Sequence, residues 1–185
     1  MILWQWLDRP GHEASRVDGT TLSGAAVFSH DRTPVRLDYA IVCDPNWITL
    51  RAEVTGWIGD RSVSIAIEAN DGRWTLNGEP QPRVDGCIDV DLNFSPCTNL
   101  LPIRRLGLAI GNEAPVRAAW LRFPSMQLEP LSQTYHRLGE TEYRYTSGDG
   151  SFSAELTVNE QGMVVDYAGV WQAVAGAGAE LKIEN

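Results

Sequence analysis

Two aspartates and one asparagine occupy alternate positions in the middle of the chain, and their types and spacing suit chemistry. Asp89, Asp91 and Asn93 would project from one side of a strand, where carboxyl groups two residues apart lie roughly 7 Å from each other. Such a pair could serve as the acid and base of a hydrolase. Calcium loops also alternate oxygen side chains, but they need Gly at the sixth position and Glu at the twelfth. This chain has Phe94 and Leu100 there, so the sequence predicts no calcium site.

Other common catalytic and cofactor motifs are absent from the sequence. The histidines, His12, His30 and His136, are far apart and lack the spacing of metal ligands. The chain contains no nucleophile-elbow, phosphate-loop or dinucleotide-binding motif. Cys97 has no base nearby in the sequence, so we interpret it as an inert, small apolar residue. We therefore expect no catalytic residue, no metal and no cofactor.

The paired arginines Arg104 and Arg105 have two possible roles. They could bind the anionic head group of a ligand, or they could pair with Asp89 and Asp91 inside the same fold. We favour the second role, because arginines next to buried structure usually find carboxylate partners.

The elements that must position these side chains change type at Ser95-Pro96. Before it, Ile88, Val90 and Leu92 alternate with polar residues, which is typical of a half-buried strand. Ser is a good N-cap and Pro suits the first helical position, and leucine and isoleucine then recur at helical spacing. We therefore predict one short helix at about 96–106, with a sheet wrapped around it.

The rest of the chain predicts strands joined by short turns. Apolar and polar residues alternate over 35–43, 48–57 and 63–68, and turn signals such as Asn70–Gly72 separate such runs. The fold class we expect is mainly β, with a long antiparallel sheet. We find no linker, so we expect one domain over 1–175 and a mobile C-terminal tail over 176–185.

Composition narrows the possible partners. The formal net charge is -9, which opposes nucleic-acid binding because that depends on arginine and lysine. No segment approaches the ~20 apolar residues of a membrane span, and residues 1–12 do not resemble a signal peptide. The three cysteines have no CxxC spacing, so we expect free thiols in a reducing cytoplasm, although a pair between Cys87 and Cys97 stays open.

Several stretches together resemble one bacterial family. They are Gly86–Leu92, Ser95–Leu106, Ala119–Ser125, Leu131–Leu138 and Asp166–Trp171, in an order and spacing similar to the putative glycolipid-binding family across about residues 3–175. The resemblance implies a spiral β-roll around a single helix, usually found as a homodimer. It also implies likeness to bacterial lipoprotein carriers, on which the glycolipid proposal rests, and it supplies no catalytic residues.

The favoured hypothesis is therefore non-enzymatic binding of a lipid or glycolipid in the concave face of the roll. Aromatic side chains would contact the ligand and arginines would meet a polar or anionic head. The candidate binding residues are Asp89, Asp91, Arg104, Arg105, Trp120, Gln133, Tyr135, Arg137, Tyr143 and Tyr167. Two alternatives stay open: an enzyme acting on a sugar or ester through Asp89 and Asp91, and a homodimeric interaction module whose sheet edges pair.

Overall fold

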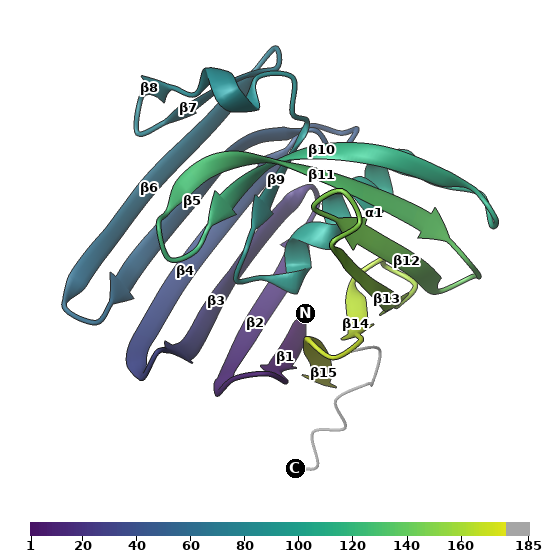
Figure 1. The fold of residues 1–185 in the computed structure, drawn as a ribbon, viewed down its shortest axis with the longest axis horizontal. Coiled ribbons are helices and arrows are strands. Elements are labelled where there is room, and N and C mark those ends of the chain that lie inside the picture. The colour runs from purple at the N-terminus through teal and green to yellow at the C-terminus, as the bar shows by residue number, and fades with distance from the viewer. Residues whose placement is uncertain (177–185) are drawn as a thin grey trace.

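The structure is a computed structural model that describes residues 1–176, and it is mainly β (Figure 1). Fifteen strands in the described chain form one sheet, and a single short α-helix lies between the two halves of that sheet. The strands of the first half are β1 (Ile2–Trp6), β2 (Gly11–Asp18), β3 (Thr21–His30), β4 (Thr33–Cys43), β5 (Thr49–Ile58), β6 (Arg61–Asn70), β7 (Arg73–Leu76) and β8 (Glu79–Pro80). Those of the second half are β9 (Asp89–Leu92), β10 (Glu113–Arg122), β11 (Gln127–Arg137), β12 (Glu142–Ser147), β13 (Phe152–Val158), β14 (Val164–Tyr167) and β15 (Trp171–Ala175).

Nearly every strand pairs with its sequence neighbours in antiparallel fashion, as the short turns require. The order is β8-β7-β6-β5-β4-β3-β2-β1-β15-β14-β13-β12-β11-β10-β9. Two pairings differ from this meander: β1 pairs with β15, which joins the two halves, and β9 runs parallel to β10. We call the β1–β15 pairing the seam.

The sheet curls so that β9, at one end of the strand order, meets strands of the first half. The backbone N–H of Thr49, at the start of β5, donates to the Ile88 carbonyl at 3.2 Å. The Thr49 hydroxyl accepts from the Val90 N–H at 3.0 Å, and the Trp74 indole donates to the Cys87 carbonyl at 3.1 Å. Strand β9 is therefore held from both sides, which confirms the expected spiral β-roll.

The predicted helix is present and begins where the sequence indicated. The Ser95 hydroxyl accepts from the Cys97 N–H at 3.1 Å and caps a 3₁₀ turn, η2 (Pro96–Asn99), which continues into α1 (Leu100–Leu106). Gly107, at φ 51°, ends the helix in the left-handed conformation that favours glycine. The helix lies between sheet layers because Leu100 and Leu101 pack with the first half and Ile103 packs with the second.

The inner faces of the two halves form the core. The larger cluster contains the inward residues of β1–β7 together with Val90, Leu92 and Leu121, and the smaller one contains Tyr135, Tyr143 and other residues of β10–β14. Alternation along each strand produces this division, because every second side chain points inward. Cys43, Cys87 and Cys97 are buried and free, so the pair that stayed open between Cys87 and Cys97 does not form.

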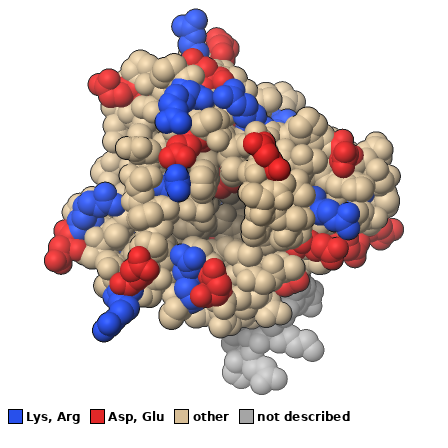
Figure 2. Space-filling view, viewed as in Figure 1, with Lys and Arg blue, Asp and Glu red and all other residues tan. Residues whose placement is uncertain are grey.

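The surface carries charges of both signs. In the view of Figure 2, basic and acidic side chains lie side by side and do not gather into one large basic patch. Within residues 1–176, no helix has the length and apolar character needed to cross a membrane. The predicted tail at 176–185 lies, from residue 177 onward, outside the described residues.

Candidate ligand-binding site

A hollow of about 530 Å³ lies among residues of the second half of the sheet, the seam and η2. We call it the aromatic hollow, because six aromatic side chains line it: Trp6, Trp120, Tyr145, Phe152, Tyr167 and Trp171. Its polar lining includes Asp91, Ser95 and Asn99. Its volume is within the range of sites that hold a small molecule or a lipid head group.

The aromatic rings form two groups on different elements. Trp6 of β1 and Trp171 of β15 stack with ring centroids 4.2 Å apart, and this contact exists because the seam places β1 beside β15. Tyr145, Phe152 and Tyr167 contact one another with centroids 6.0 to 6.2 Å apart. Ring faces and edges on several sides suit a ligand with both apolar and polar surface.

Asp91 is the carboxyl group of this hollow. It is half-buried on β9, and it lies in register with Trp120 on the parallel strand β10. The Gln133 side chain donates to Asp91 Oδ2 at 2.6 Å from β11. The pKa of Asp91 is raised to about 6, chiefly by burial; the Gln133 hydrogen bond opposes the shift and the nearby Asp89 carboxylate adds to it. A carboxyl group with a raised pKa in a pocket is a candidate for function.

Asp89, two residues earlier, belongs to the interior and does not line the hollow. Arg105 of α1 binds both of its carboxylate oxygens, at 3.1 Å from Nε and 2.5 Å from Nη2. Burial raises the pKa of Asp89, and Arg105 opposes that shift. The ion pair fixes the helix to β9, so the preferred role for the arginines holds for Arg105 with Asp89, whereas Arg104 and Asp91 form no such pair within the described residues. It also occupies the second carboxyl group that the hydrolase hypothesis requires.

The remaining candidates are spread over α1 and the second half of the sheet. Gln133 and Tyr135 are buried beside the hollow, and the Tyr135 hydroxyl donates to Asn99 Oδ1 at 2.8 Å. Arg104 is exposed and donates to the Gln161 carbonyl at 2.8 Å. Arg137 donates to three carbonyl groups near the end of β11 and lies over the Tyr143 ring, with its guanidinium carbon 5.8 Å from the centroid. Of the ten predicted residues, the structure thus brings Asp91, Trp120 and Tyr167 to the hollow's wall, and ligand binding by any of them stays a prediction.

One buried polar group was missed at the sequence level. Glu13 of β2 is fully buried, and its carboxyl oxygen Oε1 accepts from the Tyr39 hydroxyl and, at 2.6 Å, from the Ser95 hydroxyl. Burial raises the pKa of Glu13 to about 8, and the two hydrogen bonds oppose the shift. The sequence contained a signal for this buried group, because Glu13 and Ser15 occupy the inward positions of an alternating strand.

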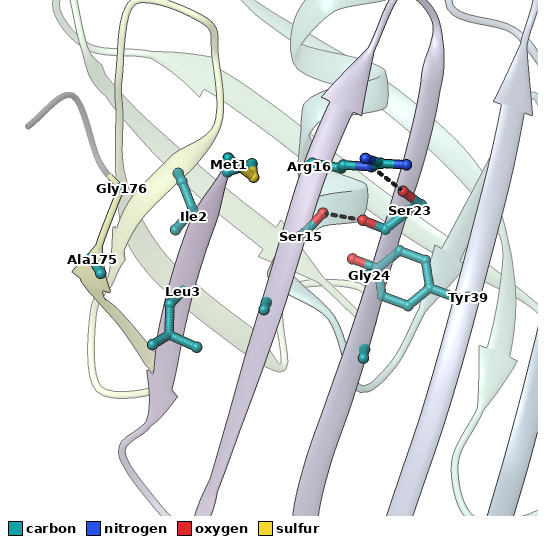
Figure 3. A pocket seen from close by; sticks show the side chains of 12 residues that line it. Met1, Ile2, Leu3, Ser15, Arg16, Ser23, Gly24, Tyr39, Ala175 and Gly176 are labelled. Atoms are coloured by element: carbon teal, nitrogen blue, oxygen red, sulfur yellow. Dashed lines mark hydrogen bonds between the residues drawn. The ribbon is translucent and has the colours of Figure 1, made fainter. Parts of the chain in front are cut away.

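A second hollow, the outer groove, lies across β1, β2 and β3 beside β15 (Figure 3). Its volume is about 560 Å³, and small residues, Ala14, Gly24 and Ala25, form part of its lining together with Leu3. None of the ten candidate residues lines it. The outer groove is therefore a separate feature from the aromatic hollow.

Comparison with known proteins places the chain in a family. A family model described as "Putative glycolipid-binding" matches residues 1–173. The chain belongs to this family. The glycolipid-binding family thus covers nearly the whole length, in agreement with the resemblance found in the sequence.

A solved structure is similar to this chain. It is the crystal structure, at 1.80 Å resolution, of a DUF1089 family protein from Pseudomonas aeruginosa. The two sequences are 36% identical, the match covers 86% of this chain and 90% of that one, and the TM-score is 0.81. No curated protein matches the chain.

Proposed function

We propose that the protein binds a glycolipid, with the head group in the aromatic hollow and without catalysis. The observation that carries this proposal is the hollow itself, which six aromatic side chains line together with the half-buried carboxyl group of Asp91. Sugars present apolar C–H faces and hydroxyl groups, and rings with a few polar groups contact both. The family description supports the same ligand class.

An indole N–H adds support for a polar ligand. Trp6 lines the hollow, and its buried Nε1 has no hydrogen-bond partner among the described residues. Trp4, two residues earlier, does find one, since its Nε1 donates to the Val164 carbonyl at 2.7 Å. A buried donor without an acceptor is costly, so an oxygen of the ligand would stabilise it.

The test is binding of defined lipids to the intact protein. Native mass spectrometry should show a co-purified or added glycolipid, and Trp120→Ala should weaken its binding by about tenfold or more because the lining ring beside Asp91 is lost. Trp57→Ala is the matched control, since Trp57 is 38% exposed on β5 and does not line the hollow. Absence of any bound lipid from the preparation and from a lipid panel would contradict the proposal.

We also propose that the protein forms a homodimer through the outer groove. Leu3 of β1 lines the groove, and Val27 and Val174 are further exposed apolar residues on β3 and β15, two strands that contribute to its lining. Exposed apolar surface of this kind is common at protein interfaces. Sedimentation at several concentrations should show a dimer that Val27→Glu disrupts and that Thr55→Glu, on the exposed side of β5, does not. A strict monomer would contradict the proposal.

We propose a cytoplasmic location for the protein. Its three cysteines are buried, free thiols, as expected in a reducing compartment. Cell fractionation with immunodetection tests the proposal, and recovery of the protein outside the cytoplasm would contradict it.

A further inference from the structure

The carboxyl group of Asp91 has no cationic neighbour in the part of the chain that the structure describes. Its hydrogen-bond partner, Gln133, is neutral. The nearby Asp89 is already paired with Arg105, and both oxygens of that carboxylate are occupied. Asp91 therefore has a hydrogen bond but no counter-ion, in a half-buried place where an ionised carboxylate is costly.

One arginine does line the hollow, but its charge is already balanced. Arg9 Nε lies 3.0 Å from Asp8 Oδ1, and both residues line the hollow. The Arg9 guanidinium also stacks on the Trp6 ring, with its central carbon 4.3 Å from the ring centroid. The charges of Asp8 and Arg9 cancel. The ionised Asp91 therefore gives the lining of the hollow a net negative charge.

The aromatic rings around Asp91 have the electrostatic character that suits a cation. The faces of tryptophan and tyrosine rings are electron-rich, and they attract positively charged nitrogen, most strongly where water is excluded. Trp120 is in register with Asp91, and Tyr145 and Tyr167 line the same hollow. A carboxylate among several such rings is one arrangement that suits a bound ammonium group.

We propose that the head group bound in the aromatic hollow carries a positively charged nitrogen, which Asp91 neutralises and the surrounding rings contact. This inference rests on the proposed glycolipid binding and specifies the ligand as a lipid with an amino sugar. An anionic head group is disfavoured, because the formal net charge of the chain is -9 and the hollow already holds an unpaired carboxyl group.

A matched series of lipids tests the inference on the unmodified protein. The probes are glucosaminyl, N-acetylglucosaminyl and glucosyl diacylglycerol in detergent micelles at neutral pH, which differ only at one sugar substituent. We expect the glucosaminyl lipid to bind about tenfold tighter or more than both neutral lipids, because it alone brings a charge to Asp91. A phosphocholine lipid is the fourth probe. If this lipid bound as tightly as the glucosaminyl lipid or more tightly, the result would support recognition of a positively charged nitrogen. It would identify a quaternary ammonium group as the source of that nitrogen.

The variant Asp91→Asn tests the same inference by changing the protein instead of the lipid. Asparagine keeps the shape and the oxygen that accepts from Gln133, so the expected result is loss of the preference for the charged lipid with glucosyl binding retained. Equal or tighter binding of the glucosyl lipid to the unmodified protein would overturn this inference and leave glycolipid binding intact. If none of the glycosyl or choline lipids bound, the proposed function would fail as well. The lipid series gives its answer even if the variant does not fold.

Discussion

Asp89 and Asp91 lie two residues apart on one face of β9, but their surroundings differ. Asp89 is 1% exposed and is bound on both oxygens by Arg105, whereas Asp91 is half-buried and faces the hollow with a neutral partner. Burial raises the pKa of both groups, but only Asp89 has a cation that opposes it. Asp89 therefore stabilises the fold, and Asp91 is the carboxyl group that we propose for ligand binding.

Removing the charge of Asp89 should destabilise the protein. In Asp89→Asn, Arg105 keeps its charge and loses its counter-ion, although its side chain is only 16% exposed. Breaking a buried ion pair at one partner typically lowers the free energy of unfolding by about 3 kcal/mol. Urea denaturation of the two proteins measures the difference.

The matched control is the surface pair between Arg36 and Asp38. Its side chains are 54% and 39% exposed, so Asp38→Asn should change the free energy of unfolding by less than about 1 kcal/mol. Equal effects at the two positions would show that the Arg105 pair contributes no more than an exposed one.

Glu13 should make stability depend on pH. Its pKa is about 8 in the folded protein against 4.5 for an ordinary glutamate, so the folded state holds a proton that the unfolded chain releases. Its stabilising contribution is therefore complete below pH 4.5 and is lost as the pH rises through about 8. Glu13→Gln keeps the accepting oxygen for Tyr39 and Ser95 but cannot ionise.

We expect the stability advantage of Glu13→Gln over the unmodified protein to grow as the pH rises. Between pH 5 and pH 9, Glu13→Gln should gain stability over the unmodified protein by an amount on the order of 4 kcal/mol. Denaturation at a series of pH values measures this, with the exposed Glu53→Gln as control. A difference that does not vary with pH would mean that Glu13 ionises normally in the folded protein.

At the scale of elements, Ser95 couples the helix to the hollow. Its hydroxyl caps η2 by accepting from Cys97 N–H, and it donates to Glu13. Ser95→Ala should lower the free energy of unfolding by about 1 to 2 kcal/mol through loss of the cap and of a buried hydrogen bond. It should also weaken ligand binding, because Pro96 and Asn99 of η2 line the hollow.

Thermal or urea denaturation and lipid titration measure the two effects of Ser95→Ala. Ser125→Ala is the control, since that exposed hydroxyl donates to a carbonyl away from the hollow. Unchanged stability would contradict the role of Ser95 as a cap.

Local patterns predicted most of the elements and only part of the site. Alternation and turn residues indicated the long strands, and Ser95-Pro96 indicated the helix, because these signals lie within a few residues of one another. The parallel pairing of β9 with β10 and the seam join distant segments, which no local pattern reveals. Strand β15 begins at Trp171, in a region where alternation is short and alanine and glycine are frequent.

The short range of local patterns also explains which residues of the hollow the sequence predicted. Asp91, Trp120 and Tyr167 were found because their types suit binding and their strands are regular. Trp6 and Trp171 were missed because they meet only at the seam, although each was visible as one of seven tryptophans. Tyr145 alternates with Tyr143, so the sequence contained its signal.

At the scale of the whole molecule, we propose that residues 1–175 unfold as one domain. The seam hydrogen-bonds the first and second halves, and the larger core cluster contains residues of both. Chemical denaturation followed by tryptophan fluorescence and by far-ultraviolet circular dichroism should therefore give coincident single transitions. Two separated transitions would show that the halves are independent units.

The seam also sets an order of events during synthesis. Strands β2 to β7 each meet a neighbour that leaves the ribosome next, so this part of the sheet can pair as it emerges. Strand β1 is made before them, and its second partner, β15, is made last of all the described strands. Until then one edge of β1 offers unpaired backbone groups to other chains. The stacked pair of Trp6 and Trp171, and with it one wall of the hollow, is therefore completed only when the newest strand closes against the oldest.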